Sequence, residues 1–231
     1  MNTVLREEKK YLVSVEEFLK KCHYLDQFLI QDIHNGTHGY SIRSLYFDTV
    51  YDKDYFEKQA GVETRKKIRL RIYDTSSAVA MLEMKQKQGA NQLKRSLRIT
   101  RSDAESLISG HYHVLLKYKE PFAAECYGLM EVQCYRPKTI VEYNRKAFVA
   151  KENKIRITFD NTIVSTESSF DLFSERLNMN PVLSLYDVIL EVKYNGFLLG
   201  YIKDMLASID KSELSVSKYV LARQNAYNTH I

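Results

Sequence analysis

Regular alternation of apolar and charged side chains is the feature that most constrains the fold of this chain. In residues 67–74, KIRLRIYD, isoleucine and leucine alternate with lysine and arginine. Successive side chains of a β-strand point to opposite faces of its sheet, so a period of two residues is typical of a strand. We therefore expect a strand here with one apolar and one cationic face, and the question is which face is turned inward.

The same alternation recurs along the chain and predicts a protein rich in antiparallel β-structure. The predicted strands cover about 5–13, 41–49, 66–73, 79–88, 92–100, 138–147, 154–160 and 187–195. Between two of them, the sequence QGAN at 88–91 is typical of a hairpin turn, because Gly and Asn tolerate a positive φ angle. We therefore expect eight strands in a largely antiparallel order.

Helical segments are predicted between these strands. Ser14 with Glu17, and Ser102 with Glu105, have the spacing of capping boxes, which mark the start of a helix. The predicted helices cover 15–30, the segment from Ser102 to near Gly110, 51–59, 112–131, 198–209 and 215–225. The segment 162–186 has weak periodicity and is expected to form either a mobile flap or a plain surface connection.

Length and composition fit one globular domain, expected over residues 1–231. A net charge of +5 is too small to predict a nucleic-acid partner. The three cysteines show no disulfide or zinc spacing. No stretch approaches the roughly 20 apolar residues that span a bilayer, and the N-terminus lacks the apolar core of a signal peptide. We expect a cytoplasmic protein without direct membrane insertion.

Charged side chains gather on one face of nearly every predicted strand. That face carries Arg6, Glu8, Lys10, Lys67, Arg69, Arg71, Glu83, Lys85, Lys87, Lys94, Arg98, Tyr143, Arg145, Arg156, Asp160, Glu191 and Lys193. The opposite faces carry apolar residues, among which we place Ile189 and Val192. Amphipathic segments such as 15–30 and 197–209 need an apolar surface to pack on. We therefore expect an α+β fold, an eight-stranded antiparallel β-barrel with helices outside and charged faces toward a narrow lumen.

Cations confined in such a lumen need anionic partners, because an unpaired buried charge costs several kcal/mol. The carboxylates expected there, Glu8, Glu83 and Glu191, are too few for all of the cations. Arg and Lys suit phosphate oxygens, so a linear chain of phosphates is the expected ligand. Nucleic acid is not expected, because the chain offers no aromatic motif for base stacking. Glu191 could hold Mg²⁺ or Mn²⁺ jointly with phosphate oxygens.

An ordered set of motifs resembles a known family. These motifs are REEKKY, SLYFDT, KIRLRIY, LEMKQK, LKRSL, VEYNRKAF, KIRITFDN, LEVKYNG and SVSKYVLA. In this order they resemble the VTC (vacuolar transporter chaperone) catalytic domain, a polyphosphate-polymerase branch of the CYTH-like triphosphate tunnel metalloenzyme superfamily. The resemblance covers about residues 5 to 222 and implies transfer of the γ-phosphoryl group of ATP to a growing polyphosphate chain in a tunnel of eight strands.

The resemblance also implies roles for individual residues. Five residues would bind phosphate and have a catalytic role: Arg69, Arg71, Arg145, Arg156 and Lys218. Further phosphate contacts would come from Lys10, Lys85, Lys94, Tyr143 and Lys193. Glu191 would be a metal ligand, with Glu8 as a second carboxylate, for Mn²⁺ or Mg²⁺. Eukaryotic members of the family carry membrane helices, so the resemblance implies a separate membrane partner if synthesis is coupled to transport.

One departure from the superfamily pattern affects the choice of reaction. Hydrolytic members open with an ExExK strand, whereas the matching face here reads Arg6, Glu8 and Lys10. Loss of the first carboxylate weakens the case for a second metal ion and favours a transferase over a hydrolase. Three functions stay open: a polyphosphate polymerase, a metal-dependent tri- or polyphosphatase, and a non-catalytic module that binds polyphosphate or nucleotide. The oligomeric state is not predicted.

Overall fold

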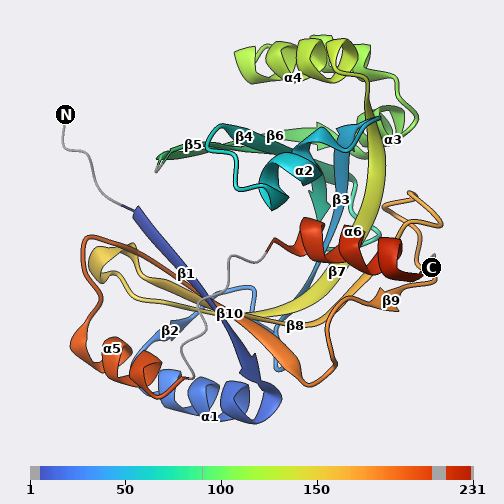
Figure 1. The fold of residues 1–231 in the computed structure, drawn as a ribbon. Coiled ribbons are helices and arrows are strands. Elements are labelled where there is room, and N and C mark those ends of the chain that lie inside the picture. Colours follow the sequence, from blue (N-terminus) through green and yellow to red (C-terminus); the bar gives the residue numbers. More distant parts are fainter. Residues whose placement is uncertain (1–5, 90, 210–216, 230–231) are drawn as a thin grey trace. The chain divides into compact units, whose positions relative to one another are not determined.

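The computed structural model describes residues 6–89, 91–209 and 217–229 (Figure 1). The strands are β1 (Arg6–Ser14), β2 (Ile30–Gln31), β3 (Tyr40–Thr49), β4 (Arg65–Ile72), β5 (Val79–Gln88), β6 (Asn91–Thr100), β7 (Tyr135–Val149), β8 (Arg156–Thr166), β9 (Asn180–Pro181) and β10 (Asp187–Asn195). The α-helices are α1 (Val15–Leu25), α2 (Lys53–Gln59), α3 (Arg101–Ile108), α4 (Pro121–Val132), α5 (Gly200–Ala207) and α6 (Lys218–Thr229). Two short 3₁₀ helices are η1 (Tyr112–Lys117) and η2 (Glu152–Lys154).

The strands belong to one hydrogen-bonded sheet, with the order β1-β10-β8-β7-β3-β4-β5-β6. The short strands β2 and β9 add to β7 and β8. Neighbouring strands pair antiparallel, as in β1 with β10 and in the run β3-β4-β5-β6. The predicted α+β class and its eight antiparallel main strands are confirmed, while the two-residue strands β2 and β9 are too short to give a periodic signal.

Several predicted helix boundaries are wrong, for local reasons. The capping box of Ser14 and Glu17 is present at the start of α1, but this helix ends at Leu25 rather than near residue 30. Helix α3 is capped by Thr100, whose hydroxyl accepts from the backbone N–H of Asp103, and not by Ser102. The single helix predicted over 112–131 is divided into η1 and α4, because a proline restricts the residue before it to extended conformations.

The chain divides into two compact units. Unit 1 consists of Met1–Ser41, Tyr143–Ile163 and Leu183–Val216, and unit 2 of Ile42–Glu142, Val164–Val182 and Ser217–Ile231. Strands β3, β7 and β8 contribute residues to both units. In the described part of the chain, no helix has the length and apolar character that crossing a bilayer requires.

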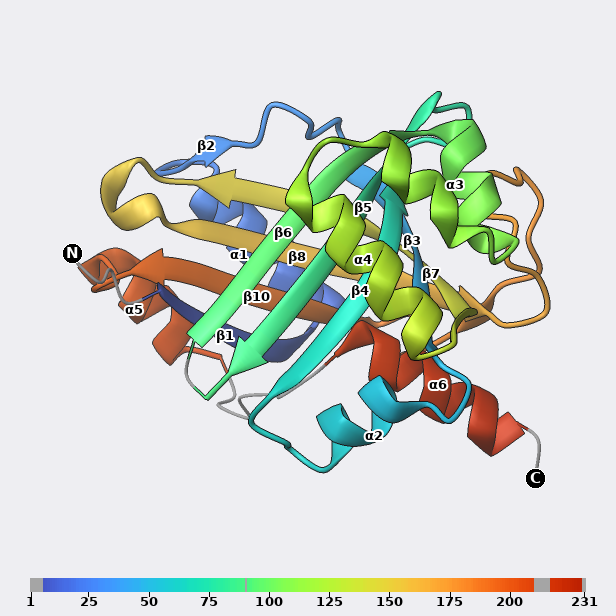
Figure 2. The same ribbon diagram turned by 90° about the horizontal axis from the view of Figure 1, so that it is seen from above.

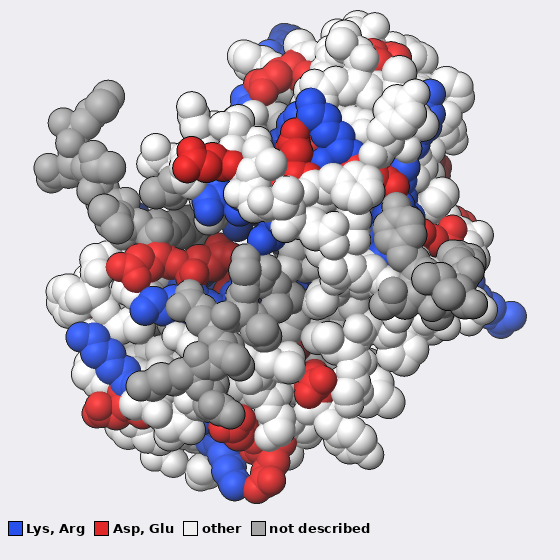
Figure 3. All heavy atoms as spheres, in the orientation of Figure 1, with Lys and Arg blue, Asp and Glu red and all other residues white. Residues whose placement is uncertain are grey.

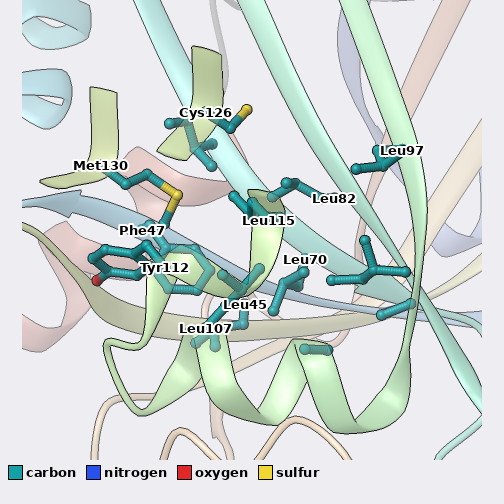
Figure 4. Packing of buried hydrophobic residues seen from close by; sticks show 14 of the residues in the cluster. Leu45, Phe47, Leu70, Leu82, Leu97, Leu107, Tyr112, Leu115, Cys126 and Met130 are labelled. Carbon is teal, nitrogen blue, oxygen red and sulfur yellow. The ribbon is translucent and has the colours of Figure 1, made fainter. Parts of the chain in front are cut away.

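The core of unit 2 lies between the run β3-β4-β5-β6 and the helical elements α3, η1 and α4 (Figure 2). Alternate residues of the strands, such as Leu70 and Leu82, pack against Leu107, Leu115 and Met130 of these helices (Figure 4). The helices therefore cover the apolar face of the strands, as the sequence predicts. Most charged residues of β4, β5 and β6 occupy the opposite face. Lys66 and Arg95 are exceptions, because they lie on the apolar side and contact Asp54 of α2 and Glu125 of α4.

The core of unit 1 lies between β1, β10 and β8 and the helices α1 and α5. Val188, Leu190 and Val192 of β10 belong to this core, but Ile189 does not. The prediction that Ile189 lies on the apolar face is wrong. Alternate residues of a strand share a face, so Ile189 lies on the same face of β10 as Glu191 and Lys193. Its position opposite the buried Asp160 agrees with that assignment.

Candidate functional site

A row of three lysines crosses the charged face of β4, β5 and β6 in unit 2. Lys67 lies directly opposite Lys85, and Lys85 lies directly opposite Lys94. Like charges that face each other across neighbouring strands are destabilising, by roughly 0.2–1 kcal/mol for a pair. Positive charge is therefore concentrated along this row, and a bound anion would relieve the repulsion.

The next row on this face is organised by one buried carboxylate. Glu83 of β5 lies opposite Arg69 of β4 and Ser96 of β6. Its Oε2 lies 2.7 Å from Nη2 of Arg69 and 3.4 Å from Nη2 of Arg71, and its Oε1 lies 2.5 Å from Nζ of Lys94. Three positive charges thus surround one negative charge, and the four side chains together remain cationic.

Glu83 is held in its ionised form by these neighbours. Burial opposes ionisation of the carboxyl group, but the charge of Arg69 and the hydrogen bond from Lys94 outweigh it and lower the pKa of Glu83. Arg71 is also buried, and its Nε makes no hydrogen bond within the described part of the chain. This donor capacity, together with the excess positive charge, is suited to binding an anion with several oxygen atoms.

The start of helix α6 adjoins the same cationic face. Nζ of Lys67 donates to Oγ of Ser217 at 3.3 Å, and Lys218 follows as the first residue of α6. Tyr46 of β3 lies opposite Arg69, and its hydroxyl accepts from Nη1 of Arg69 at 2.9 Å. Unit 2 therefore brings Arg69, Arg71, Lys85 and Lys94 together, with Lys218 one residue beyond a direct contact of Lys67.

In unit 1, the charged residues of β1 and β10 form an alternating pattern. Lys10 lies opposite Glu191, and Glu8 lies opposite Lys193. Nζ of Lys10 lies 2.7 Å from Oε1 of Glu8 and 3.9 Å from Oε2 of Glu191, while Lys193 contacts both carboxylates. Although burial opposes it, the charges of Lys193, Lys10 and Arg145 hold the pKa of Glu191 well below its usual range. Glu191 is therefore ionised throughout the physiological range.

Arg145 is held by a fully buried carboxylate. Its Nε and Nη2 donate to the two oxygens of Asp160 at 2.6 and 2.8 Å, and its guanidinium lies 5.4 Å from the ring centre of Tyr143. Burial opposes the charge of Arg145, but Asp160 outweighs it and raises the pKa of the guanidinium. On the same unit, Arg156 contacts Asp32 at 2.7 Å and donates to the hydroxyl of Tyr40 at 3.1 Å.

These contacts correct the prediction that carboxylates on the charged faces are too few. Besides Glu8, Glu83 and Glu191, Asp160 of β8 pairs with Arg145, and Asp32, which lies outside the strands, pairs with Arg156. Lys10, Tyr143, Arg145, Arg156, Lys193, Glu8 and Glu191 all lie in unit 1. Figure 3 shows basic and acidic side chains in direct contact on the face in view. The charge of unit 1 is thus largely balanced internally, and the clear excess of positive charge lies on β4, β5 and β6.

Glu8 and Glu191 are the residues that could hold a divalent cation. They lie on neighbouring strands, and their oxygens already contact Lys10 and Lys193, so a cation would have to share or displace these lysines. The described residues contain no group of three or more His, Cys, Asp or Glu side chains placed to hold a metal ion. Mg²⁺ and Mn²⁺ suit this pair, because such ions are commonly held by one or two carboxylates together with substrate phosphates and water.

Comparison with known proteins finds a matching family and solved structures with a similar fold. A family model described as the VTC domain matches residues 5–227. A Bacillus halodurans protein provisionally named an adenylate cyclase shares 13% identity and a TM-score of 0.53, covering 92% of this chain and 95% of its own. A Vibrio parahaemolyticus protein with the same provisional name shares 13% identity and a TM-score of 0.52, covering 95% and 98%. At this identity, the two structures show a shared fold.

No significant match is found among curated proteins.

Proposed function

The chain belongs to the VTC domain family, and on this premise we propose that it is a phosphotransferase that extends inorganic polyphosphate with the γ-phosphoryl group of ATP. Family and fold support the broader statement that the chain is an enzyme acting on nucleotide or triphosphate substrates. The polymerase reaction is the finer proposal. It agrees with Arg6 at the position where hydrolytic relatives of the fold are expected to carry a carboxylate.

The observation that carries the proposal is the excess of positive charge on β4, β5 and β6. Lys67, Lys85 and Lys94 lie in register across three strands. Glu83 is shared by Lys94 and two further cations, Arg69 and Arg71. A neutral ligand would leave the repulsion in place, whereas a chain of phosphates supplies one negative charge or more for each phosphorus atom. Arginine adds paired donors that match phosphate oxygens, and lysine adds point charges.

The proposed chemistry needs few groups beyond these cations. An oxygen of the terminal phosphate of the polyphosphate chain attacks the γ-phosphorus of ATP, the bond to the β-phosphate oxygen breaks, and ADP leaves. The attacking phosphate is already ionised, so no general base is required. Catalysis is then mainly positioning and stabilisation of charge on the transferred group. In unit 2, Arg69, Arg71 and Lys218 would bind phosphate oxygens, with Lys85 and Lys94 beside them.

In unit 1, Arg145 and Arg156 would have the same role, with Lys10, Tyr143 and Lys193 as further contacts. These side chains already hold carboxylates, so a phosphate would have to share or replace an existing partner. Glu8 and Glu191 would hold Mn²⁺ or Mg²⁺, which would neutralise charge on the phosphates when bound. A membrane partner would be a separate protein if synthesis is coupled to transport.

The decisive experiment is an assay with ATP and Mn²⁺ or Mg²⁺, with and without a short polyphosphate primer. We expect ADP release together with chains that lengthen with time, separated by gel electrophoresis. Orthophosphate without long chains would replace the polymerase with a hydrolase. Binding of tripolyphosphate without release of ADP or orthophosphate, at any primer length, would leave only a binding module. The Arg71→Ala variant is the negative control, and Arg176→Ala, on an exposed loop, matches its change of charge.

A further inference from the structure

Within unit 2, helix α6 is held by two buried polar anchors together with packing of the Tyr219 ring. Among its residues with described side chains, the buried ones are Tyr219, Ala222 and Arg223. A surface helix usually docks through an apolar stripe, which tolerates small rotations and shifts. Hydrogen bonds and ion pairs depend on direction and distance, so a polar dock fixes the position of a helix more narrowly.

The first anchor of this dock is the hydrogen bond between Tyr219 and Asp48. The hydroxyl of Tyr219 donates to Oδ2 of Asp48 at 2.6 Å, and both side chains are almost completely buried. Asp48, near the end of β3, also accepts from the backbone N–H groups of Thr49, Asp54 and Tyr55. Burial and the charge of Asp48 raise the pKa of Tyr219, so its hydroxyl stays protonated as a donor. One carboxylate therefore joins β3, the first turn of α2 and α6.

The second anchor lies one helical turn further along α6. Arg223 donates from Nη2 to Oδ2 of Asp52 at 2.7 Å and from Nη1 to Oε2 of Glu167 at 2.6 Å. Tyr219 and Arg223 are separated by four residues, so both point from the same side of α6. Two anchors on one side define the rotation of the helix as well as its position.

The dock is connected directly to the cationic face. The ring of Tyr219 stacks on the ring of Tyr46, with centres 5.2 Å apart and an angle of 29° between the planes. The hydroxyl of Tyr46 accepts from Arg69, and Lys67 donates to Ser217, two residues before Tyr219. Any shift of Tyr219 would therefore move Ser217 and the beginning of α6 relative to these two cations.

We propose that Asp48 and Tyr219 are positioning residues that hold Ser217 and Lys218 against the Lys67 and Arg69 side of the phosphate site, an inference that presupposes the proposed phosphate chemistry. Neither Asp48 nor Tyr219 needs to touch the ligand. Asp48 would act through Tyr219, and Tyr219 would act through the backbone that it shares with Lys218.

A double-mutant cycle tests this coupling. Tyr219→Phe removes the hydroxyl and keeps the ring, Lys218→Ala removes the ammonium group, and the double variant combines them. Titration calorimetry with tripolyphosphate gives each affinity at low salt. We expect Lys218→Ala to weaken binding by about tenfold in the wild-type background, as for loss of a bond to a charged group. In the Tyr219→Phe background the same change should cost about threefold or less, because Lys218 is no longer held in place.

The controls separate a positional effect from a general loss of structure. Tyr127→Phe removes the hydroxyl of a tyrosine on α4 and should leave the affinity and the effect of Lys218→Ala unchanged. If Tyr219→Phe fails to fold, Arg223→Lys tests the same coupling through the second anchor, since it keeps the charge and loses the paired donors. The far-UV circular dichroism of each variant confirms that the fold is retained.

The outcomes for the two proposals differ. If the wild-type protein binds no tripolyphosphate, the proposed function is wrong and the positioning role falls with it. If the wild-type protein binds and the two substitutions have additive effects, the proposed function stands and the positioning role of Asp48 and Tyr219 is overturned.

Discussion

Lys85 of β5 lies directly opposite Lys94 of β6, so two ammonium-bearing side chains share a cross-strand site on the charged face. Like charges in such positions repel by roughly 0.2–1 kcal/mol, part of which Glu83 offsets through its contact with Lys94. We predict that Lys85→Gln keeps or raises the free energy of unfolding measured in urea, by up to about 0.5 kcal/mol. The same variant should bind tripolyphosphate several-fold more weakly, because one positive charge of the site is lost.

Lys203→Gln is the matched control, since Lys203 is exposed on α5. This variant should change neither quantity. A clear loss of stability in Lys85→Gln together with unchanged binding would mean that Lys85 has a structural role and does not contact phosphate.

Glu83 should make the protein sensitive to acid. Its pKa is lowered in the folded protein, so its contribution to stability is present above its ordinary value of 4.5 and is lost as the pH falls through the folded-state value. We predict that Glu83→Gln lowers the free energy of unfolding by about 3 kcal/mol near neutral pH, since it leaves Arg69, Arg71 and Lys94 without their shared partner. The difference from the wild type should shrink as the pH falls below 4.5.

The measurement is urea unfolding at a series of pH values, with Glu175→Gln on an exposed loop as the control. If the difference in the free energy of unfolding between wild type and Glu83→Gln does not change with pH, the contribution of Glu83 to stability does not depend on its ionisation.

Asp54 should have the opposite effect to Glu83 on how stability changes with pH. It is buried at the start of α2, where its Oδ2 accepts from the hydroxyl of Tyr135 at 2.8 Å. Burial and the nearby Asp48 raise its pKa to about 7, against an ordinary value of 3.8. Between these values the folded protein holds a proton that the unfolded chain releases, so this group lowers the free energy of unfolding as the pH rises.

Asp54→Asn removes that effect and keeps an acceptor for Tyr135. We predict that the free energy of unfolding of the variant, relative to that of wild type, rises by at least about 1 kcal/mol between pH 4 and pH 8. This value is smaller than the full pKa shift would give. Asp204→Asn, an exposed carboxylate on α5, should show no such gain. A constant difference between Asp54→Asn and wild type over this range would exclude the raised pKa.

Arg145 combines a structural contact with a proposed catalytic role, and the two can be separated. Arg145→Met leaves the charge of Asp160 buried without its partner, which should cost about 3–5 kcal/mol of stability. The double variant Arg145→Met with Asp160→Asn removes both charges and should recover much of this loss. Thermal unfolding measures the recovery, and tripolyphosphate binding by the double variant, compared with Asp160→Asn alone, then reports on Arg145. Wild-type affinity in the folded double variant would remove Arg145 from the phosphate site.

The strands and their two-sided character could be predicted because the period of two is local. Residues 79–88 and 187–195 coincide with β5 and β10, and the expected apolar faces pack against helices. Among the wrong predictions are the face assigned to Ile189, where the alternation along the strand was not followed, and the N-cap of α3, where two residues could have served. Thr100 precedes Ser102 by two residues and has Asp103 at the correct spacing, so its hydroxyl starts α3 first.

The contacts of the site depend on register, which alternation alone does not determine. Sequence could place Lys85 and Lys94 on charged faces, but only the pairing of β5 with β6 sets them opposite each other. Partners from loops had no periodic signal, which is why Asp32 was missed as the partner of Arg156. The role of Asp48 was missed for a similar reason, because its partner Tyr219 is 171 residues away in the chain.

Calorimetric titration of tripolyphosphate into the wild-type protein, Arg71→Ala and Arg176→Ala tests most directly whether the charged face of β4, β5 and β6 binds a chain of phosphates. We predict that the wild type binds, that Arg71→Ala weakens the affinity by about tenfold or more, and that Arg176→Ala changes it by about twofold at most. Higher salt should weaken binding in every case. Equal affinities for the wild type and Arg71→Ala, or no binding by the wild type, would contradict the assignment of this face as the phosphate site.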